Sequence, residues 1–172
     1  MTRYEIDPDR SRVEIDARSS LHPIHSRTDG LEGEVSLDFD DGGKLDPSSA
    51  PAGRLSLPVS KLRSGNRLEE RELQRRIEAR RFPTIDGTLS AIDAAGEDGH
   101  YRVAGELTFR GVSRPQEGTM TIRPVDGTTV ELAGSSRFDI RDFGMEPPKV
   151  LMLRVEPVVE VRVEITARAK EL

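Results

Sequence analysis

Residues 107–120 read LTFRGVSRPQEGTM, and this stretch decides the fold. Apolar and polar residues alternate up to Phe109, Arg110 and Gly111 interrupt the alternation, and a second alternation begins after Pro115. Alternation with a period of two is typical of a β-strand with one buried face. Because glycine adopts the backbone angles that tight turns need, the stretch predicts a β-hairpin with Gly111 in its turn. Pro115 is expected to form a rigid start to the second strand.

The same alternation recurs along the rest of the chain. In residues 11–19, SRVEIDARS, the apolar residues Val13, Ile15 and Ala17 share one face, and charged residues occupy the other. Comparable patterns, separated by turns rich in Gly, Asp and Pro, occur at residues 4–6, 31–39, 55–59, 85–91, 101–109, 118–122, 130–134 and 159–165. We therefore expect about eight or nine antiparallel strands, the number found in a closed barrel or a sandwich.

Glycines within these strand patterns favour the barrel. Gly33, Gly87, Gly105, Gly118 and Gly134 each fall on an otherwise apolar face. Glycine weakens a strand, and it commonly marks a sharp bend or a close approach of two backbones. A strongly coiled barrel needs such positions more than a flat sandwich does.

One segment has the composition of a helix. Residues 66–83, NRLEERELQRRIEARRFP, contain good helix formers and a thin apolar stripe, and Pro83 is expected to stop the helix. Such a helix has little to bury by itself, so we expect it to cover one end of the barrel. Pro157 cannot donate to a β-ladder and should mark a bulge, a bend or an edge in the last strand.

The overall composition restricts the classes of function. The chain has 172 residues, a formal net charge of −5 and no cysteine. One domain spanning residues 1–172 is expected, and thiol chemistry and Cys-ligated zinc are excluded. The acidic balance argues against a nucleic-acid partner. The N-terminus has no apolar signal segment and no stretch is long enough for a membrane span, which predicts a cytoplasmic protein without stable membrane insertion.

Taken in order, the motifs resemble those of the YceI-like family. The matching stretches are YEIDPDRSRVEIDARSS (4–20), GLEGEVSLDF (30–39), the long segment 55–92, VAGELTFRGVSRP (103–115) and FDIRDFGM (138–145). The resemblance implies an all-β fold, an eight-stranded antiparallel up-and-down, lipocalin-like β-barrel with one short helix near a barrel mouth. It also implies a cavity that holds a long-chain amphiphile, such as a polyisoprenoid, an isoprenoid quinone or a fatty amide or acid. Members are often homodimers, and no cofactor or catalysis is expected.

The cavity should be lined by residues of the inward face, which a one-residue register slip would expose together. The candidate lining residues are Val13, Ile15, Val35, Leu37, Leu57, Phe82, Ile85, Leu89, Val103, Leu107, Phe109, Met120, Leu132, Phe138, Phe143, Val161 and Val163. The alternative is a barrel plugged by these same side chains. A plugged barrel would suit a ligand-free dimeric interaction module.

Polar candidates are fewer. His22 and His25 flank Pro23 and could contact a head group at the barrel mouth, as could Arg141. The two histidines could instead belong to a metal-dependent enzyme, although no third ligand is identifiable. The arginines of residues 63–81 are interleaved with glutamates, which indicates a solvated helix with internal ion pairs, while a basic lid that meets membrane or pyrophosphate groups is the alternative. The main hypothesis is non-enzymatic binding, transport or storage of a long apolar ligand.

Overall fold

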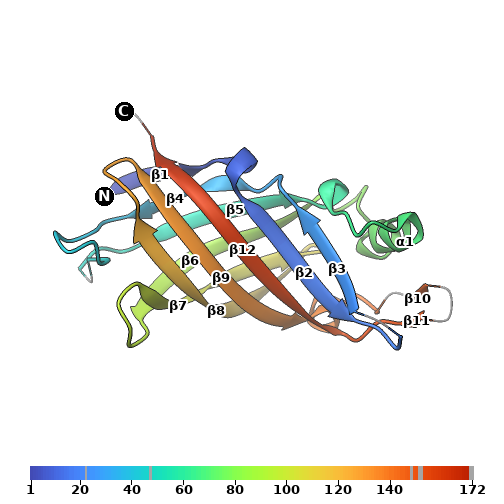
Figure 1. Ribbon diagram of the computed structural model, residues 1–172. Helices are drawn as coiled ribbons and strands as arrows, with labels where there is room; N and C mark the ends of the chain where they lie inside the picture. Colours follow the sequence, from blue (N-terminus) through green and yellow to red (C-terminus); the bar gives the residue numbers. More distant parts are fainter. Residues whose placement is uncertain (22, 47, 148, 151–152, 171–172) are drawn as a thin grey trace.

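The computed structural model describes residues 1–172 except 22, 47, 148, 151–152 and 171–172. Eight antiparallel strand lines close into a barrel, in which each line pairs with the next along the chain (Figure 1). Two lines are each formed by two strands end to end, β1 (Thr2–Ile6) with β2 (Arg12–Arg18) and β3 (Pro23–Thr28) with β4 (Glu32–Leu37). The other six lines are β5 (Ala52–Pro58), β6 (Thr84–Ala94), β7 (His100–Phe109), β8 (Val112–Pro124), β9 (Thr129–Asp139) and β12 (Val158–Ala169). The predicted eight-stranded antiparallel barrel is confirmed.

Strand β12 closes the barrel. It pairs with β9 over its whole length on one side, from Val158 to Arg168. On the other side it pairs first with β2 and then with β1, which are separated by the short 3-10 helix η1 (Pro8–Arg10). The Lys170 N–H donates to the Arg3 carbonyl at 2.8 Å, so the two ends of the chain lie side by side (Figure 1).

The helix lies at the opposite end of the barrel. The 3-10 helix η2 (Val59–Lys61) and helix α1 (Arg67–Ile77) connect β5 to β6. Asn66 starts α1 because its side chain accepts from the N–H groups of Leu68 and Glu69. The expectation that the helix runs to Pro83 was wrong, because Glu78 adopts the left-handed conformation and ends it. In the described part of the chain, no helix is long and apolar enough to span a membrane.

The hairpin predicted from the opening stretch is present between β7 and β8. Its two turn residues, Arg110 and Gly111, have φ angles of 52° and 72°, as a two-residue type I′ turn requires. Pro115 does not begin the second strand, which already starts at Val112. Pro115 is tolerated inside β8 because that strand pairs with β9 only from Thr119 onward, so the other edge of β8 is free here.

Three further segments differ from the sequence pattern. Strand β3 begins at Pro23, although the strand patterns did not include this segment, and Pro at the first position leaves the rest of the ladder intact. A bulge at Ser90 shifts the register of β6, so Ile92 and not Ala91 packs against the core. The last strand starts after Pro157, and η3 (Ile140–Phe143), β10 (Lys149–Val150) and β11 (Leu153–Arg154) precede it.

The barrel is plugged at the end where the chain begins and finishes. Tyr4, Leu37, Tyr101 and Ile122 are buried there. The Tyr101 hydroxyl accepts from the Leu45 N–H at 3.1 Å, which fastens the loop before β5 over this end. The hollow part of the barrel therefore extends from its middle toward α1.

Candidate functional site

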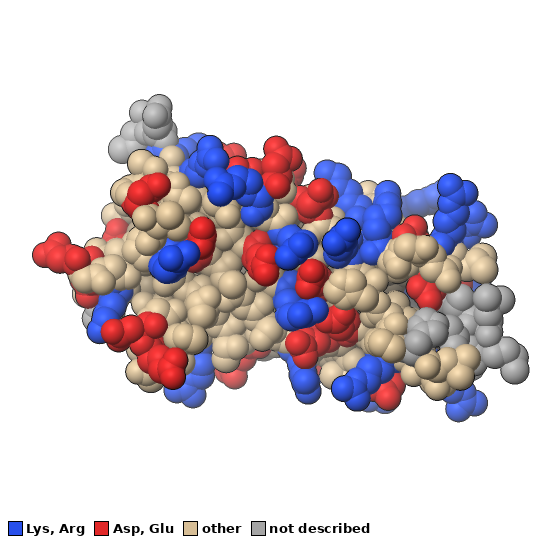
Figure 2. All heavy atoms as spheres, in the orientation of Figure 1, with Lys and Arg blue, Asp and Glu red and all other residues tan. Residues whose placement is uncertain are grey.

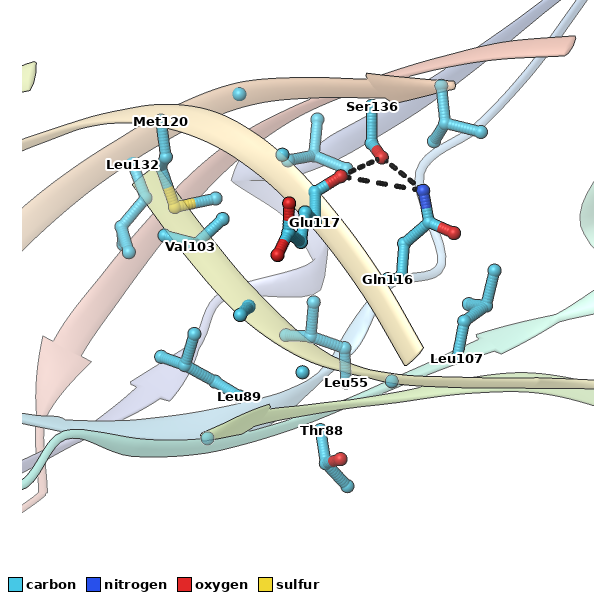
Figure 3. Close-up of a pocket in the computed structure, with 18 of the residues that line it drawn as sticks. Leu55, Thr88, Leu89, Val103, Leu107, Gln116, Glu117, Met120, Leu132 and Ser136 are labelled. Atoms are coloured by element: carbon cyan, nitrogen blue, oxygen red, sulfur yellow. Dashed lines mark hydrogen bonds between the residues drawn. The ribbon is translucent and has the colours of Figure 1, made fainter. Parts of the chain in front are cut away.

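The middle of the barrel contains an apolar cavity of about 200 Å³, here called the central cavity. Figure 3 shows Leu55, Leu89, Val103 and Met120 around it, while Thr88 points away from it. The remaining aliphatic lining residues are Ile6, Val35, Leu107, Leu132, Val161, Val163 and Ile165. A space lined by such groups suits an apolar chain.

Glycines shape this cavity in two different ways. A Cβ added to Gly105 would lie 1.7 Å from the Thr88 carbonyl oxygen, so this glycine allows β6 and β7 to approach closely. A Cβ added to Gly87 would have a single neighbour within 4 Å, the Glu106 carbonyl oxygen at 4.0 Å. Gly87 therefore contributes empty space to the cavity.

The cavity wall has a seam between β8 and β9. The ladder between these strands covers Thr119–Pro124, and side chains bridge the rest. Gln116 Nε2 donates to Ser136 Oγ at 2.5 Å, and Ser136 Oγ donates to the Glu117 carbonyl at 2.6 Å (Figure 3). Gln116 Nε2 also donates to the Arg137 carbonyl at 2.8 Å. The polar groups of the seam bond to one another, so the cavity surface stays apolar.

A second apolar space of about 100 Å³, here called the mouth cavity, lies beneath α1. Helix residues Leu73 and Ile77 contact it from one side, and Ile85 and Val159 from the barrel. Along β6 and β12 the next inward positions, Gly87 and Val161, line the central cavity. Because inward residues recur every second position, the two cavities are adjacent layers along the barrel axis.

Aromatic rings form one wall of the mouth cavity. Phe109 and Phe138 line it, and Phe143 lies behind them, fully buried. The three rings meet edge to face, with centroids 5.6–6.4 Å apart. Phe138 lies near the end of β9 and Phe143 is the last residue of η3. Asp139 between them caps η3 by accepting from the Arg141 N–H at 2.9 Å.

The polar residues among the described lining of the mouth cavity come from β3, from the loop before α1 and from α1 itself. Ser26, Ser64, Glu69 and Glu70 are among its lining residues. Glu70 Oε1 accepts from the N–H groups of Ser64 and Gly65 at 2.9 and 3.2 Å. The mouth cavity therefore has hydroxyl and carboxylate groups on one side.

The structure distributes the predicted lining residues over four environments. The central cavity contacts Val35, Leu89, Val103, Leu107, Met120, Leu132, Val161 and Val163. The mouth cavity contacts Ile15, Ile85, Phe109 and Phe138. Val13, Leu37, Leu57 and Phe143 are buried in the core, and Phe82 packs over the Gly111 turn.

Two of the polar candidates, His25 and Arg141, lie outside both cavities. His25 faces outward on β3, where its Nδ1 contacts Asp16 of β2. The pKa of Asp16 is lowered, first by the hydrogen bond to His25 and further by the charge of Arg162. Arg141 is exposed and pairs with Asp139 at 2.7 Å. His22 lies outside the described residues, within which no group of three or more His, Cys, Asp or Glu could hold a metal.

Sequence reasoning did not single out several residues of the site. The mouth cavity includes Leu62, Leu73, Ile77 and Met145, which lie outside the period-two strand patterns. The spacing of Leu73 and Ile77, four residues apart on a helix, was the available signal. The Gln116–Ser136 bridge had no sequence signal, because it depends on where the ladder between β8 and β9 stops.

Comparison with known proteins gives a consistent family and fold. Residues 4–167 match the family model for the YceI-like domain. Among solved structures, BcnA of Burkholderia cenocepacia is 18% identical with a TM-score of 0.77 and covers 94% of this chain and 98% of its own. A polyisoprenoid binding domain from Saccharophagus degradans is 15% identical with a TM-score of 0.76, and 99% of this chain and 100% of that chain are covered. The Campylobacter jejuni YceI protein is 16% identical with a TM-score of 0.65, and 85% of each chain is covered. No curated protein matches the sequence.

Proposed function

Because the chain belongs to the family of YceI-like domains, we propose that it binds a long-chain apolar amphiphile inside the barrel and carries or stores it unchanged. The observation that carries this proposal is the central cavity, an apolar space of about 200 Å³ along the barrel axis. The plugged barrel of an interaction module would have filled this space with side chains. Gly87 leaves it open instead.

The ligand class follows from the lining. Burying one five-carbon isoprenoid unit gains about 3–4 kcal/mol at roughly 0.8 kcal/mol for each methylene-sized group, before ordering costs. The proposed ligand is a polyisoprenoid or a similar aliphatic chain, in keeping with the polyisoprenoid binding domain of Saccharophagus degradans. Its tail occupies the central cavity and its chain continues through the mouth cavity.

The polar end of the ligand is proposed to lie beneath α1. Ser26 and Ser64 offer hydroxyl groups there, and the carboxylates of Glu69 and Glu70 disfavour an anionic head group at the same place. A neutral alcohol or carbonyl fits best. We assign no head-group contact to His25 or Arg141, because both are paired on the outer surface.

The test is to fill the cavity from Gly87. In Gly87→Leu the new Cβ comes no closer than 4.0 Å to its one neighbour, the Glu106 carbonyl oxygen, so we expect the leucine side chain to extend into the central cavity and the barrel to fold. We expect the affinity for farnesol, a neutral isoprenoid alcohol, to fall at least about tenfold in calorimetric titration, since a contact worth about 1.4 kcal/mol corresponds to a factor of ten. Extraction of the purified wild type into organic solvent, followed by mass spectrometry, should yield a lipid that the variant lacks.

The matched control is Thr88→Leu, which introduces a leucine at the next residue of β6, where the side chain points away from the cavity. The control should bind farnesol like the wild type. Equal farnesol binding by the wild type and Gly87→Leu, or a wild type that neither binds farnesol nor yields a lipid, would exclude binding in this cavity.

A further inference from the structure

A group of arginines at the α1 end of the barrel lacks acidic partners. Arg63, Arg67 and Arg71 surround a surface depression beside α1, and Arg27 of β3 lies directly opposite Arg63. These four residues are here called the arginine patch. All four are exposed, and none has a carboxylate within ion-pair distance among the described residues. Figure 2 shows blue side chains gathered over this end of the molecule.

The glutamates interleaved with these arginines are engaged elsewhere. Glu72 pairs with Arg75 and Arg76 at 2.9 and 2.8 Å, and these hydrogen bonds lower the pKa of its carboxyl. Glu78 pairs with Arg110 of the hairpin turn at 2.9 Å. Because these glutamates pair with arginines outside the patch, positive charge remains on the outer face of α1.

Glu69 and Glu70 turn toward the mouth cavity. Glu70 also borders the depression of the arginine patch, so the patch lies immediately outside the mouth cavity. The Glu70 carboxylate accepts hydrogen bonds from the backbone N–H groups of Ser64 and Gly65. The arginine patch and the mouth cavity thus lie on either side of Glu70.

Apolar side chains accompany the patch. Leu68 projects from the solvent face of α1 between Arg67 and Arg71 and is 50% exposed. Leu21, in the turn between β2 and β3 at the same end of the barrel, is 80% exposed (Figure 1). Arginines together with exposed leucines are typical of a surface that lies in the interface of a membrane. A nucleic acid offers phosphates to the arginines, but its backbone has no apolar surface in which the exposed leucines could be buried.

We propose that the arginine patch docks the α1 end of the barrel onto a membrane surface that contains anionic lipids. Each arginine gains from the negative surface potential, and Leu68 enters the interfacial region. Docking in this orientation brings the mouth cavity to the membrane. This last consequence rests on the proposed function, whereas the docking itself does not.

Vesicle sedimentation tests the proposal. The protein is mixed with vesicles of phosphatidylcholine alone or of phosphatidylcholine with phosphatidylglycerol, at about 0.1 M and about 0.5 M salt. The wild type should sediment with the anionic vesicles at the lower salt concentration only. The triple variant Arg63→Gln, Arg67→Gln, Arg71→Gln should bind about 100-fold more weakly, because each arginine contributes about fivefold.

The control removes the same number of charges at the other end of the barrel. Arg3, Arg10 and Arg102 are exposed there, and the triple variant with Gln at these positions should sediment like the wild type. Circular dichroism checks that both triple variants are folded. A wild type that ignores anionic vesicles, or two triple variants that bind equally, would overturn the proposal. Duplex DNA bound through the patch, without vesicle binding, would assign it to nucleic acid instead.

The two proposals can fail independently. Gly87→Leu alters the cavity and leaves the outer face of α1 intact, so it should sediment with anionic vesicles like the wild type. A wild type that sediments with anionic vesicles but does not bind farnesol would contradict the proposed function and support the docking surface. A wild type that binds farnesol but does not sediment with the vesicles would contradict the docking surface and support the proposed function.

Discussion

At the scale of single residues, glycine has two opposite roles in one barrel wall. Gly87 and Gly105 lie on adjacent strands and both line the central cavity. At Gly105 a Cβ would overlap the Thr88 carbonyl oxygen, so a side chain there requires β6 and β7 to move apart. At Gly87 the place is empty. Gly105 shapes the wall, and Gly87 sets the volume available to a ligand.

Alanine scanning at these two positions should separate the roles. Gly105→Ala forces β6 and β7 apart, and we expect it to lower the free energy of unfolding by about 1–3 kcal/mol. Gly87→Ala meets no close neighbour and should leave stability unchanged or raise it by up to about 1 kcal/mol. Urea denaturation of both variants measures the difference. Equal losses of stability would contradict this account of the wall.

At the scale of elements, Arg110 holds α1 over the barrel. Its guanidinium pairs with Glu78 at the end of α1 and donates to the carbonyl of Gly144 at the end of η3. Among the described residues, Glu78 and Arg110 are the non-glycine residues with positive φ. Such conformations persist where surrounding contacts impose them, and here the two strained residues stabilise each other.

Removing this contact should loosen the helix. Arg110→Ala loses charge-assisted hydrogen bonds, and we expect a loss of about 1–3 kcal/mol in stability, together with faster hydrogen exchange of the amides of α1. Arg141→Ala is the control, since Arg141 is exposed and pairs with its neighbour Asp139, and it should change stability by less than about 0.5 kcal/mol. Unchanged exchange in α1 after Arg110→Ala would show that other contacts hold the helix.

At the scale of the whole molecule, the barrel closes through β12 and brings the ends of the chain together. Tyr4 of β1 pairs with Ala169 of β12. Every strand line of the closed ring is paired on both sides over at least part of its length, which protects the sheet against edge-to-edge association. The positions of the ends also mean that chain order is not essential to the architecture.

Circular permutation tests this conclusion. Joining the two ends by a short Gly–Ser linker and opening the chain at Gly127, in the turn between β8 and β9, should give a folded barrel with a single cooperative transition. Opening it at Val163 should not, because β12 is paired on both sides there. Far-ultraviolet circular dichroism and urea unfolding distinguish the two. A folded Val163 permutant would show that the pairing of β12 is dispensable.

The amino-acid sequence determined the class of the fold, because alternation is a local property of an extended backbone. It predicted the β7–β8 turn at Gly111, the inward face that includes Val35, Leu107 and Val161, and the family. The homodimer and the cytoplasmic location stay predictions, since a single chain carries no observation on either.

Only the tertiary structure decided which side chains meet. The bulge at Ser90, the outward position of His25 and the division of the hollow into two cavities depend on the register of paired strands. The same holds for the pairing of Glu78 with Arg110, which the hairpin turn brings together, whereas the pairing of Glu72 within α1 follows from the sequence spacing. Alternation extends over a few neighbouring residues, whereas register and charge pairing are set when distant segments close into one barrel.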